Sequence, residues 1–401
     1  MAEQVSGSHY QRLHHMLSES AWSRSDVRHL LVKDANQHFG HAAALVFDES
    51  AFAKKGEMSA GVARQWNGRL GKTDNSQVGV FAALVRDRAC ALVDGELFVP
   101  EHWFATPERC KAAGMPEALD FRTKGEIVVE MLLRLRREGL HFSHVVFDAG
   151  YGHLPWLLSE LDAEGETFLA EVHADQTIFL ADPKPMVPER VSTRGKAPRR
   201  LRAQTPLQTV TAWAKTQPAS AWRRLSVRSG EKGDVVAEYL TQRVFVWDGA
   251  TTKARCWHLL VRREIGGSKL KFCLSNAKPQ ASLRRLASMQ ADRHFVERAF
   301  EDAKGACGMA DYQVRGWQAW HHHRALVMVA LMFLAKERLV NRDTAKLLSC
   351  HDLIDIMRYK LPIKVQTDDD LVAMIEERHR RRQTASDSAY QKQGRILKAL
   401  D

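Results

Sequence analysis

The sequence predicts an α/β fold, in which a mixed sheet with flanking helices is interrupted by a β-rich insertion. Strand-like apolar runs alternate with amphipathic helical stretches over residues 41–169, which is typical of an α/β layer. Short strand-like pieces between Gly- and Pro-containing turns fill residues 170–280, and helical periodicity returns over 281–347. With 401 residues, 45% of them hydrophobic, the chain can bury a sizeable core and divides into several regions.

The N-terminal part supplies the first elements of this prediction. Residues 1–40 form a helical region, a possible DNA-binding segment, with a Ser-rich break near 18–25. The run 42–50 predicts a strand that ends in acidic residues. Residues 76–100 predict two or three strands joined by the turn-prone Asp94-Gly95 pair.

The second half of the core region follows the same alternation. The stretch 123–139 predicts an amphipathic helix stopped by Gly139, and 141–152 predicts a strand that ends at Asp148. A helix over about 153–164 follows directly. In such a layer, functional residues are expected at the C-terminal ends of strands.

The remaining segments carry weaker signals. Residues 182–203 predict an extended basic loop, because prolines exclude regular structure there, and residues 348–401 predict a charged helical tail. Among the tryptophans of the insertion, core packing is favoured over DNA stacking. His321, His322 and His323 are consecutive, so on a helix they point about 100° apart and do not converge on one metal ion.

Composition narrows the class of protein. Lys plus Arg outnumber Asp plus Glu by 59 to 48, and the formal charge of +11 favours a polyanionic partner. No run of 18 apolar residues and no secretory signal is present, so we expect a cytoplasmic protein with no membrane association. The six cysteines are scattered without a CxxC pair, which favours reduced, mostly buried residues.

Three acidic residues are candidates for chemistry. Asp48 and Asp148 end neighbouring predicted strands, and Glu297 lies in the amphipathic stretch "FVERAFEDAK". Carboxylates from two strands and a helix suit two divalent cations that promote phosphodiester chemistry. The alternatives are that each Asp caps the next turn, and that Arg293, Glu297 and Glu301 form a surface ion-pair ladder.

Four stretches in order give a more specific indication: "LVFDESAFAKKGEMSAGVARQWNGRLGKTDNSQVGVF", "LFVPEHWFATPERCKAAGMP", "VVFDAGYG" and "DRHFVERAFEDAKGACGMADYQVRGWQAWHHH". Together they resemble a DDE transposase of the bacterial insertion-sequence type, over roughly residues 10–335. The resemblance implies a ribonuclease-H-like catalytic core, divided into residues 41–169 and 281–347 by the insertion. It also implies metal-dependent cleavage at transposon ends and strand transfer into target DNA.

Residue by residue, Asp48, Asp148 and Glu297 match the three acids of the family, and Glu49 is a less favoured alternative to Asp48. They would bind two Mg²⁺ ions, for which Mn²⁺ substitutes. The family's Tyr-Arg-Glu-Lys signature has two, three and six residues between its members. Arg293, Glu297 and Lys304 fit this spacing, whereas Gln290 replaces the Tyr.

The resemblance also implies partners and further DNA-binding residues. Arg293 and Lys304 would bind DNA phosphates, joined by Lys54, Lys55 and Arg64 from the loop after Asp48. Double-stranded DNA, as terminal inverted repeats and target, is the expected substrate, with a homodimer in the DNA complex and a nucleoid-associated location. The region before Asp48 is shorter than in relatives. This departure and Gln290 leave open a transposase-derived DNA-binding protein or regulator, and a metal nuclease without strand transfer is a third possibility.

Overall fold

The structure is a computed structural model that describes residues 9–189, 196, 198–230, 233–312, 314–345, 348–361 and 367–398. The chain divides into two compact units, residues 17–354 and a second unit made of residues 1–16 and 355–401. The second unit contains α12 (Asp368–Lys398), which falls within the predicted charged tail. None of the helices in the described ranges is long and apolar enough to span a membrane.

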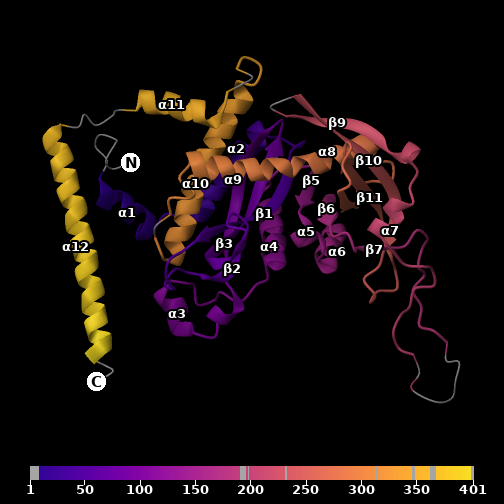
Figure 1. Ribbon diagram of the computed structural model, residues 1–401, viewed down its shortest axis with the longest axis horizontal. Coiled ribbons are helices and arrows are strands. Elements are labelled where there is room, and N and C mark those ends of the chain that lie inside the picture. Colours follow the sequence, from indigo (N-terminus) through magenta and orange to yellow (C-terminus); the bar gives the residue numbers. More distant parts are fainter. Residues whose placement is uncertain are drawn as a thin grey trace. The chain divides into compact units, whose positions relative to one another are not determined.

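A ten-stranded mixed sheet is the centre of the larger unit (Figure 1). Its strand order is β2-β3-β1-β5-β6-β12-β11-β10-β9, and β4 pairs with β3. Its first six strands in chain order are β1 (Ala44–Ala53), β2 (Ala63–Asn67), β3 (Lys72–Arg86), β4 (Ala89–Phe98), β5 (His144–Phe147) and β6 (Phe168–Val172). The remaining four are β9 (Arg223–Gly230), β10 (Gly233–Val246), β11 (Arg255–Glu264) and β12 (Leu270–Ser275).

The pairing within the sheet confirms the predicted mixed architecture. Strand β1 is antiparallel to β3 and parallel to β5, and β5 is parallel to β6. Strand β4 continues the sheet beyond β3 in the antiparallel direction. The order β4-β3-β1-β5-β6 is that of a ribonuclease-H-like core, and it places the C-terminal end of β5 beside the middle of β1.

The insertion adds its four long strands to the same sheet. Strand β12 pairs antiparallel with β6, with Phe272 opposite Val172, and β11, β10 and β9 follow in turn. Three insertion tryptophans are buried, as core packing requires: Trp213, Trp222 and Trp257. A two-stranded sheet of β7 (Thr177–Ile178) and β8 (Gln208–Thr209) precedes α7 (Val210–Lys215). The predicted basic loop 182–203 includes residues 190–195 and 197, which lie outside the described residues.

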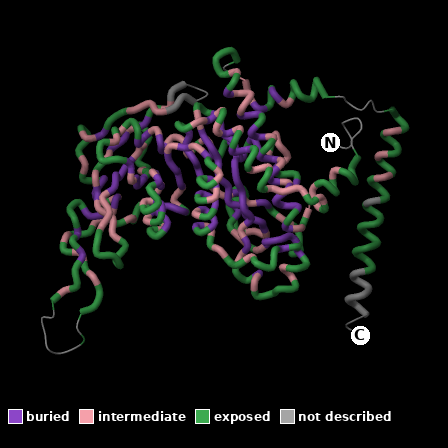
Figure 2. The backbone as a smooth tube through the Cα atoms, turned by 180° about the vertical axis from the view of Figure 1, so that it is seen from behind, coloured by how far each residue is buried: buried purple, intermediate pink, exposed green. Residues whose placement is uncertain are grey.

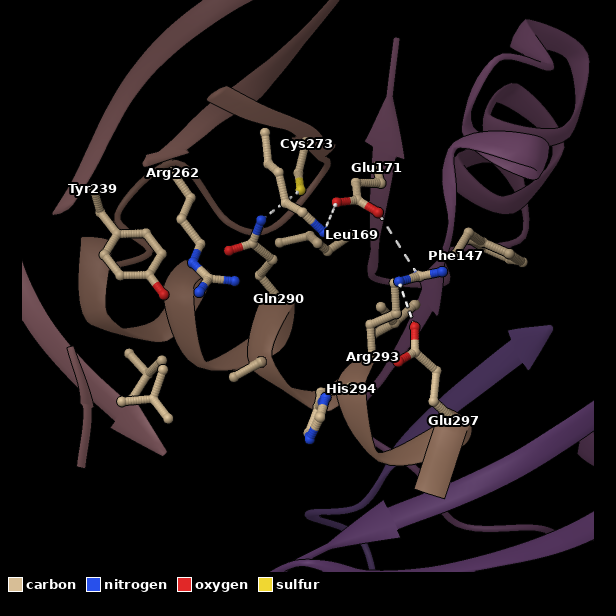
Figure 3. Close-up of a pocket in the computed structure, with 15 residues that line it drawn as sticks. Phe147, Leu169, Glu171, Tyr239, Arg262, Cys273, Gln290, Arg293, His294 and Glu297 are labelled. Carbon is tan, nitrogen blue, oxygen red and sulfur yellow. Dashed lines mark hydrogen bonds and ion pairs between the residues drawn. The ribbon is translucent and has the colours of Figure 1, made fainter. Parts of the chain in front are cut away.

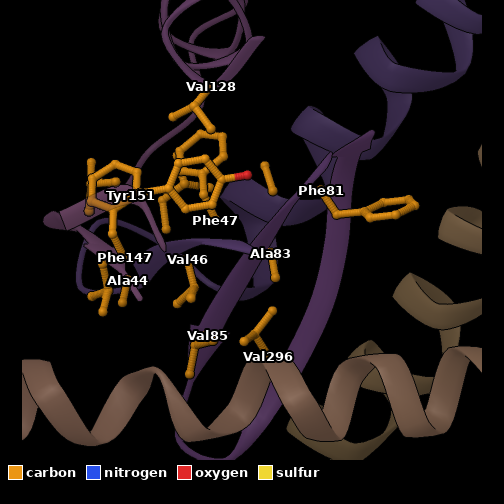
Figure 4. Close-up of a cluster of buried hydrophobic side chains, with 14 of the residues drawn as sticks. Ala44, Val46, Phe47, Phe81, Ala83, Val85, Val128, Phe147, Tyr151 and Val296 are labelled. Atoms are coloured by element: carbon orange, nitrogen blue, oxygen red, sulfur yellow. The ribbon is translucent and has the colours of Figure 1, made fainter. Parts of the chain in front are cut away.

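Helices cover both faces of the sheet around β1 (Figure 4). Side chains alternate along the strand, so Phe47 points toward Val128 of α4 (Lys124–Arg137), whereas Val46 points toward Val296 of α9 (His294–Ala306). Figure 2 shows the buried residues concentrated along these strands. The face on which each site residue lies therefore follows from its position in the alternation.

The bounds of the remaining helices follow local sequence signals. A capping box between Thr123 and Glu126 starts α4, and Gly139, with φ of +81°, follows its end. The others are α1 (Tyr10–Ser18), α2 (Arg24–His38), α3 (Pro107–Ala112), α5 (Ala149–Gly152), α6 (Pro155–Ala163), α8 (Leu283–Asp292), α10 (Trp317–Val340) and α11 (Cys350–Lys360). Two 3-10 helices also occur, η1 (Glu101–Trp103) and η2 (Ala219–Ala221).

One predicted turn is wrong. The chain reverses between β3 and β4 at Asp87 and Arg88, whose φ angles are 48° and 71°. Asp94 and Gly95 lie inside β4, where a Cβ at Gly95 would be 2.7 Å from the Phe81 ring. Asp94 pairs with Arg134 at 2.7 Å. The Asp-Gly pair therefore serves close packing and a buried ion pair rather than a turn.

Candidate active site

The two aspartates lie side by side on neighbouring parallel strands, Asp48 within β1 and Asp148 directly after β5. Val46 of β1 is in register with Val146 of β5, and Asp48 and Asp148 each come two residues later. Asp48 is still within β1 and faces the α9 side, like Val46. The topology of the sheet therefore brings together two acids that are 100 positions apart in the sequence.

Asp48 is held in an environment that disfavours its charge. Burial and the neighbouring Asp148 carboxylate raise the pKa of Asp48 from its usual 3.8 to about 7. A hydrogen bond from the Glu49 backbone N–H at 2.7 Å and the Arg293 charge oppose this rise without cancelling it. The Arg293 charge is therefore insufficient to keep the pKa of Asp48 in its usual range.

Asp148 also caps the short helix α5. Its side chain accepts hydrogen bonds from the backbone N–H groups of Gly150 and Tyr151 at 3.0 and 3.3 Å. The capping alternative weighed from the sequence is therefore present, and it fixes the position of the carboxylate beside Asp48. One Asp148 oxygen also lies 3.9 Å from the Arg293 guanidinium.

Arg293 approaches three acids, of which Figure 3 shows Glu171 and Glu297. It lies at the junction of α8 and α9, and its guanidinium is 3.9 Å from Asp148, 3.7 Å from Glu171 of β6 and 3.4 Å from Glu297 of α9. Burial opposes its charge, but Asp48, Glu171, Asp148 and Glu297 together raise the pKa of Arg293. Arg293 is therefore the positive centre of a carboxylate cluster.

Glu297 lies at the rim of this cluster. Its side chain is 57% exposed, and the ion pair with Arg293 is the i, i+4 pair that the sequence analysis considered. In the described residues, no group of three or more His, Cys, Asp or Glu side chains is gathered closely enough to hold a metal ion. Glu297 thus approaches Asp148 only through Arg293, which lies between the two carboxylates.

Glu49 has a different environment from Asp48. Its carboxylate accepts a hydrogen bond from the Tyr151 hydroxyl at 3.1 Å and pairs with Lys124 of α4 at 2.5 Å. These partners belong to the face of β1 that is opposite to α9. Asp48, and not Glu49, is therefore the neighbour of Asp148 and Arg293.

A cavity of about 130 Å³ adjoins Arg293 and Glu297 and extends toward the insertion strands (Figure 3). Gln290 lines it, is 8% exposed, and donates to the Cys273 sulfur at 3.4 Å. The Gln290 Oε1 atom has no hydrogen-bond partner, and neither has the buried Nε of Arg262 on the opposite wall. The position that replaces the family Tyr therefore lines a polar recess beside the carboxylates.

The other predicted DNA-binding residues lie at varying distances from the acids. Lys304 is half-buried near Phe52 and Phe300, and the Asp48 charge acts on it. Lys54 is half-buried and donates to the Tyr312 carbonyl at 3.2 Å. Lys55 and Arg64 are exposed, the latter on β2. Lys304 thus lies close enough to the Asp48 carboxylate for its charge to raise the pKa of this lysine against the effect of burial.

Glu171 is the residue near the site that sequence reasoning missed. It pairs with Lys271 of β12 at 3.1 Å as well as with Arg293. Its signal was an acid in the apolar strand "FLAEV", but the order of β5, β6 and β12 is needed to place it near Asp148. Glu171 connects the insertion to the candidate site.

Comparisons with known proteins add a family. Residues 1–234 match the model described as DDE superfamily endonuclease. A curated relative, the probable transposase for insertion sequence element IS701 of Microchaete diplosiphon, is 33% identical over 153 residues. That match covers 38% of this chain and 37% of the relative, so the chain spans little more than a third of the relative's length. The solved piggyBac transposase synaptic complex with hairpin DNA aligns over 80% of this chain and 52% of its own, with 12% identity and a TM-score of 0.42.

Proposed function

This chain belongs to the DDE superfamily endonucleases, since the family model matches more than half of it, and from this premise we propose that it is a DNA transposase. It cleaves phosphodiester bonds at the inverted repeats that end its element and transfers the freed strand into target DNA. The observation that supports this most directly is the adjacency of Asp48, within β1, and Asp148, directly after β5, together with the raised pKa of Asp48.

The donor set fits a hard divalent cation. Asp48 and Asp148 offer carboxylate oxygens at one sheet edge, and burial leaves Asp48 in need of a positive partner. We propose that these two residues and Glu297 hold two Mg²⁺ ions, or Mn²⁺. When bound, the ions supply Lewis-acid activation of the attacking oxygen and stabilisation of the leaving oxygen.

The residues of the chain would bind and orient the DNA. Arg293 has the planar fork that binds a phosphate in two contacts, and Lys304 supplies a point charge nearby. If Arg293 moved from the carboxylates to a DNA phosphate, Glu297 would lose its ion pair and become free to bind a metal ion. The exposed side chain of Glu297 permits this change. Lys54, Lys55 and Arg64 would add backbone contacts along the strand. Two copies of the chain, one for each transposon end, would act together on DNA in the bacterial cytoplasm.

The second candidate is a transposase-derived DNA-binding protein without transposition activity. The observation that favours it is the absence of a gathered metal-binding group among the described residues. Replacement of the family Tyr by Gln290 points the same way. This protein would bind the repeats but not cleave them.

The test uses the full chain and a labelled duplex that carries the inverted repeat flanking its own gene. With Mg²⁺ or Mn²⁺, we expect nicks at the repeat boundary followed by joined products. Asp148→Asn should abolish both products but retain DNA binding, whereas Asp175→Asn, in an exposed turn after β6, should leave both intact. Binding without cleavage in either metal would support the second candidate. Cleavage without joining would indicate a nuclease.

A further inference from the structure

One buried and two half-buried cations lie beside the candidate active site without a carboxylate partner among the described residues. They are Lys54, which follows β1, Lys304 of α9 and Arg324 of α10. Within the residues that the structure describes, none of the three makes an ion pair with an acidic side chain, and Arg324 is only 1% exposed. Burying an unpaired charge is costly, so this arrangement requires an explanation.

Two aromatic rings hold the three cations together. The Arg324 guanidinium lies 4.0 Å from the centre of the Phe52 ring, and the Lys304 ammonium lies 5.7 Å from the centre of the same ring. The Arg324 guanidinium also lies 5.2 Å from the centre of the Tyr312 ring, and the Lys54 ammonium lies 4.0 Å from that centre. Cation–π contacts offset part of the desolvation cost but leave the mutual repulsion of like charges.

Arg324 uses only part of its hydrogen-bonding capacity. Its Nη1 donates to the Met309 carbonyl at 2.7 Å, whereas Nε and Nη2 have no hydrogen-bond partner among the described residues. Burial lowers the pKa of Arg324 to about 9, and burial together with Arg324 lowers the pKa of Lys54 to about 8. Burial, Arg69 and Arg324 lower the pKa of Lys304, and Asp48 is the group that opposes this. The three cations therefore create a positive electrostatic potential next to Asp48.

The other groups around the cluster do not neutralise it. Burial, followed by Arg324 and Lys54, lowers the pKa of His323 to about 4, so this imidazole is neutral at pH 7. The Lys54 backbone is tied to the start of β3, because its N–H donates to the Asn75 carbonyl at 2.8 Å and its carbonyl accepts from Asn75 Nδ2 at 2.9 Å. The backbone that carries Lys54 is thus held in place before any ligand binds.

We propose that Lys54, Lys304 and Arg324 form a phosphate-binding site for one backbone phosphate of the DNA strand that passes Asp48. The two half-buried lysines contact the phosphate oxygens, and the buried guanidinium supplies charge from behind them. This inference rests on the proposed function and adds Arg324, which neither the sequence motifs nor the family signature singled out. It makes Arg324 a positioning residue whose charge serves DNA binding at the expense of stability.

The decisive variant is Arg324→Met, which keeps the length of the side chain and removes its charge. We expect it to fold with a Tm equal to or above that of the wild-type chain, because an unpaired buried charge is removed. Its affinity for a labelled duplex should fall about five- to tenfold at low salt, with a slope against salt concentration about one unit smaller. The matched control is Arg342→Met. Arg342 is exposed and pairs with Asp87, at the opposite end of β3 from Asn75, so its affinity should remain within about twofold of wild type.

Inorganic phosphate provides a readout that does not depend on transposition. It should raise the Tm of the wild-type chain and of Arg342→Met above the value in chloride at equal ionic strength, but not that of Arg324→Met. A folded Arg324→Met with wild-type DNA affinity, salt slope and phosphate response would overturn the proposal. If Arg324→Met does not fold, Lys54→Met should show the same losses, and its wild-type behaviour would overturn the proposal equally. Failure of the wild-type chain to bind DNA would instead refute the proposed function. The shift in Tm caused by inorganic phosphate would still test the phosphate-binding site.

Discussion

Substitution of Asp48 by Asn should make the metal-free protein more stable while it abolishes cleavage. Burial and Asp148 raise the pKa of Asp48 from 3.8 to about 7, so above pH 7 the folded chain must hold a carboxylate in surroundings that disfavour it. At about 1.4 kcal/mol per pKa unit, this rise corresponds to a ceiling of roughly 4 kcal/mol. Asn retains an oxygen that can accept the Glu49 N–H bond, so we expect a gain of about 2–4 kcal/mol at pH 8.

The pH dependence gives the sign of the effect. Between pH 4 and 7 the folded state binds the Asp48 proton more tightly than the unfolded state does, so the stability of the wild-type chain declines through this window as pH rises. The advantage of Asp48→Asn should therefore be near zero at pH 4 and complete above pH 7. Urea unfolding in EDTA, followed by tryptophan fluorescence at several pH values, measures it.

A control and a refuting result complete this test. Asp343→Asn makes the same change at a side chain that is 89% exposed, and should alter stability by less than about 0.5 kcal/mol at any pH. Addition of Mg²⁺ should stabilise the wild-type chain but not Asp48→Asn. A variant that is no more stable than wild type at pH 8, or whose advantage persists at pH 4, would refute the assignment of Asp48 as a buried, charge-deficient carboxylate.

Three further substitutions test the surroundings of the site. Arg293→Gln removes a charge that lowers the pKa of Asp48, so the acidic limb of the cleavage pH profile should move to higher pH; an unmoved limb would contradict this coupling. In Gly152→Ala the added Cβ would lie 1.8 Å from the Glu171 carbonyl oxygen, so we expect a loss of at least about 2 kcal/mol in urea unfolding and reduced cleavage. Thr123→Ala removes the N-cap of α4 and should cost about 1 kcal/mol without changing DNA affinity, which anisotropy titration checks.

Local sequence signals located most of the core elements because their causes are local. A continuous apolar run that ends in acids predicted β1, a strand whose side chains alternate between the two faces of the sheet and which extends five residues beyond Asp48, to Ala53. The same alternation distinguishes Asp48 from Glu49, whose partners lie on the other face. That Asp48, Asp148 and Glu297 bind metal stays a prediction, since Arg293 occupies the space between two of them.

Features that depend on distant parts of the chain were not predictable in the same way. Glu171 reaches Arg293 only because β6 lies next to β5. Asp94-Gly95 has the composition of a turn, but both residues lie in β4 and pair with β3. Gly95 packs closely against the Phe81 ring. In the sequence, Arg324 cannot be distinguished from an arginine on the surface of a helix. Only the packing of α10 shows that it is buried and that no acidic side chain among the described residues pairs with it.

The pairing of β6 with β12 has a consequence for how the chain folds during synthesis. Val172 is complete on the ribosome about 100 residues before its partner Phe272, and at about 5–20 residues per second this interval lasts roughly 5–20 s. Throughout it, β6 presents an unpaired edge next to the half-built core, and such edges recruit other chains. Synthesis of the insertion therefore sets a window of aggregation risk, and a nascent chain stalled before β12 would expose the same edge for as long as the ribosome waits.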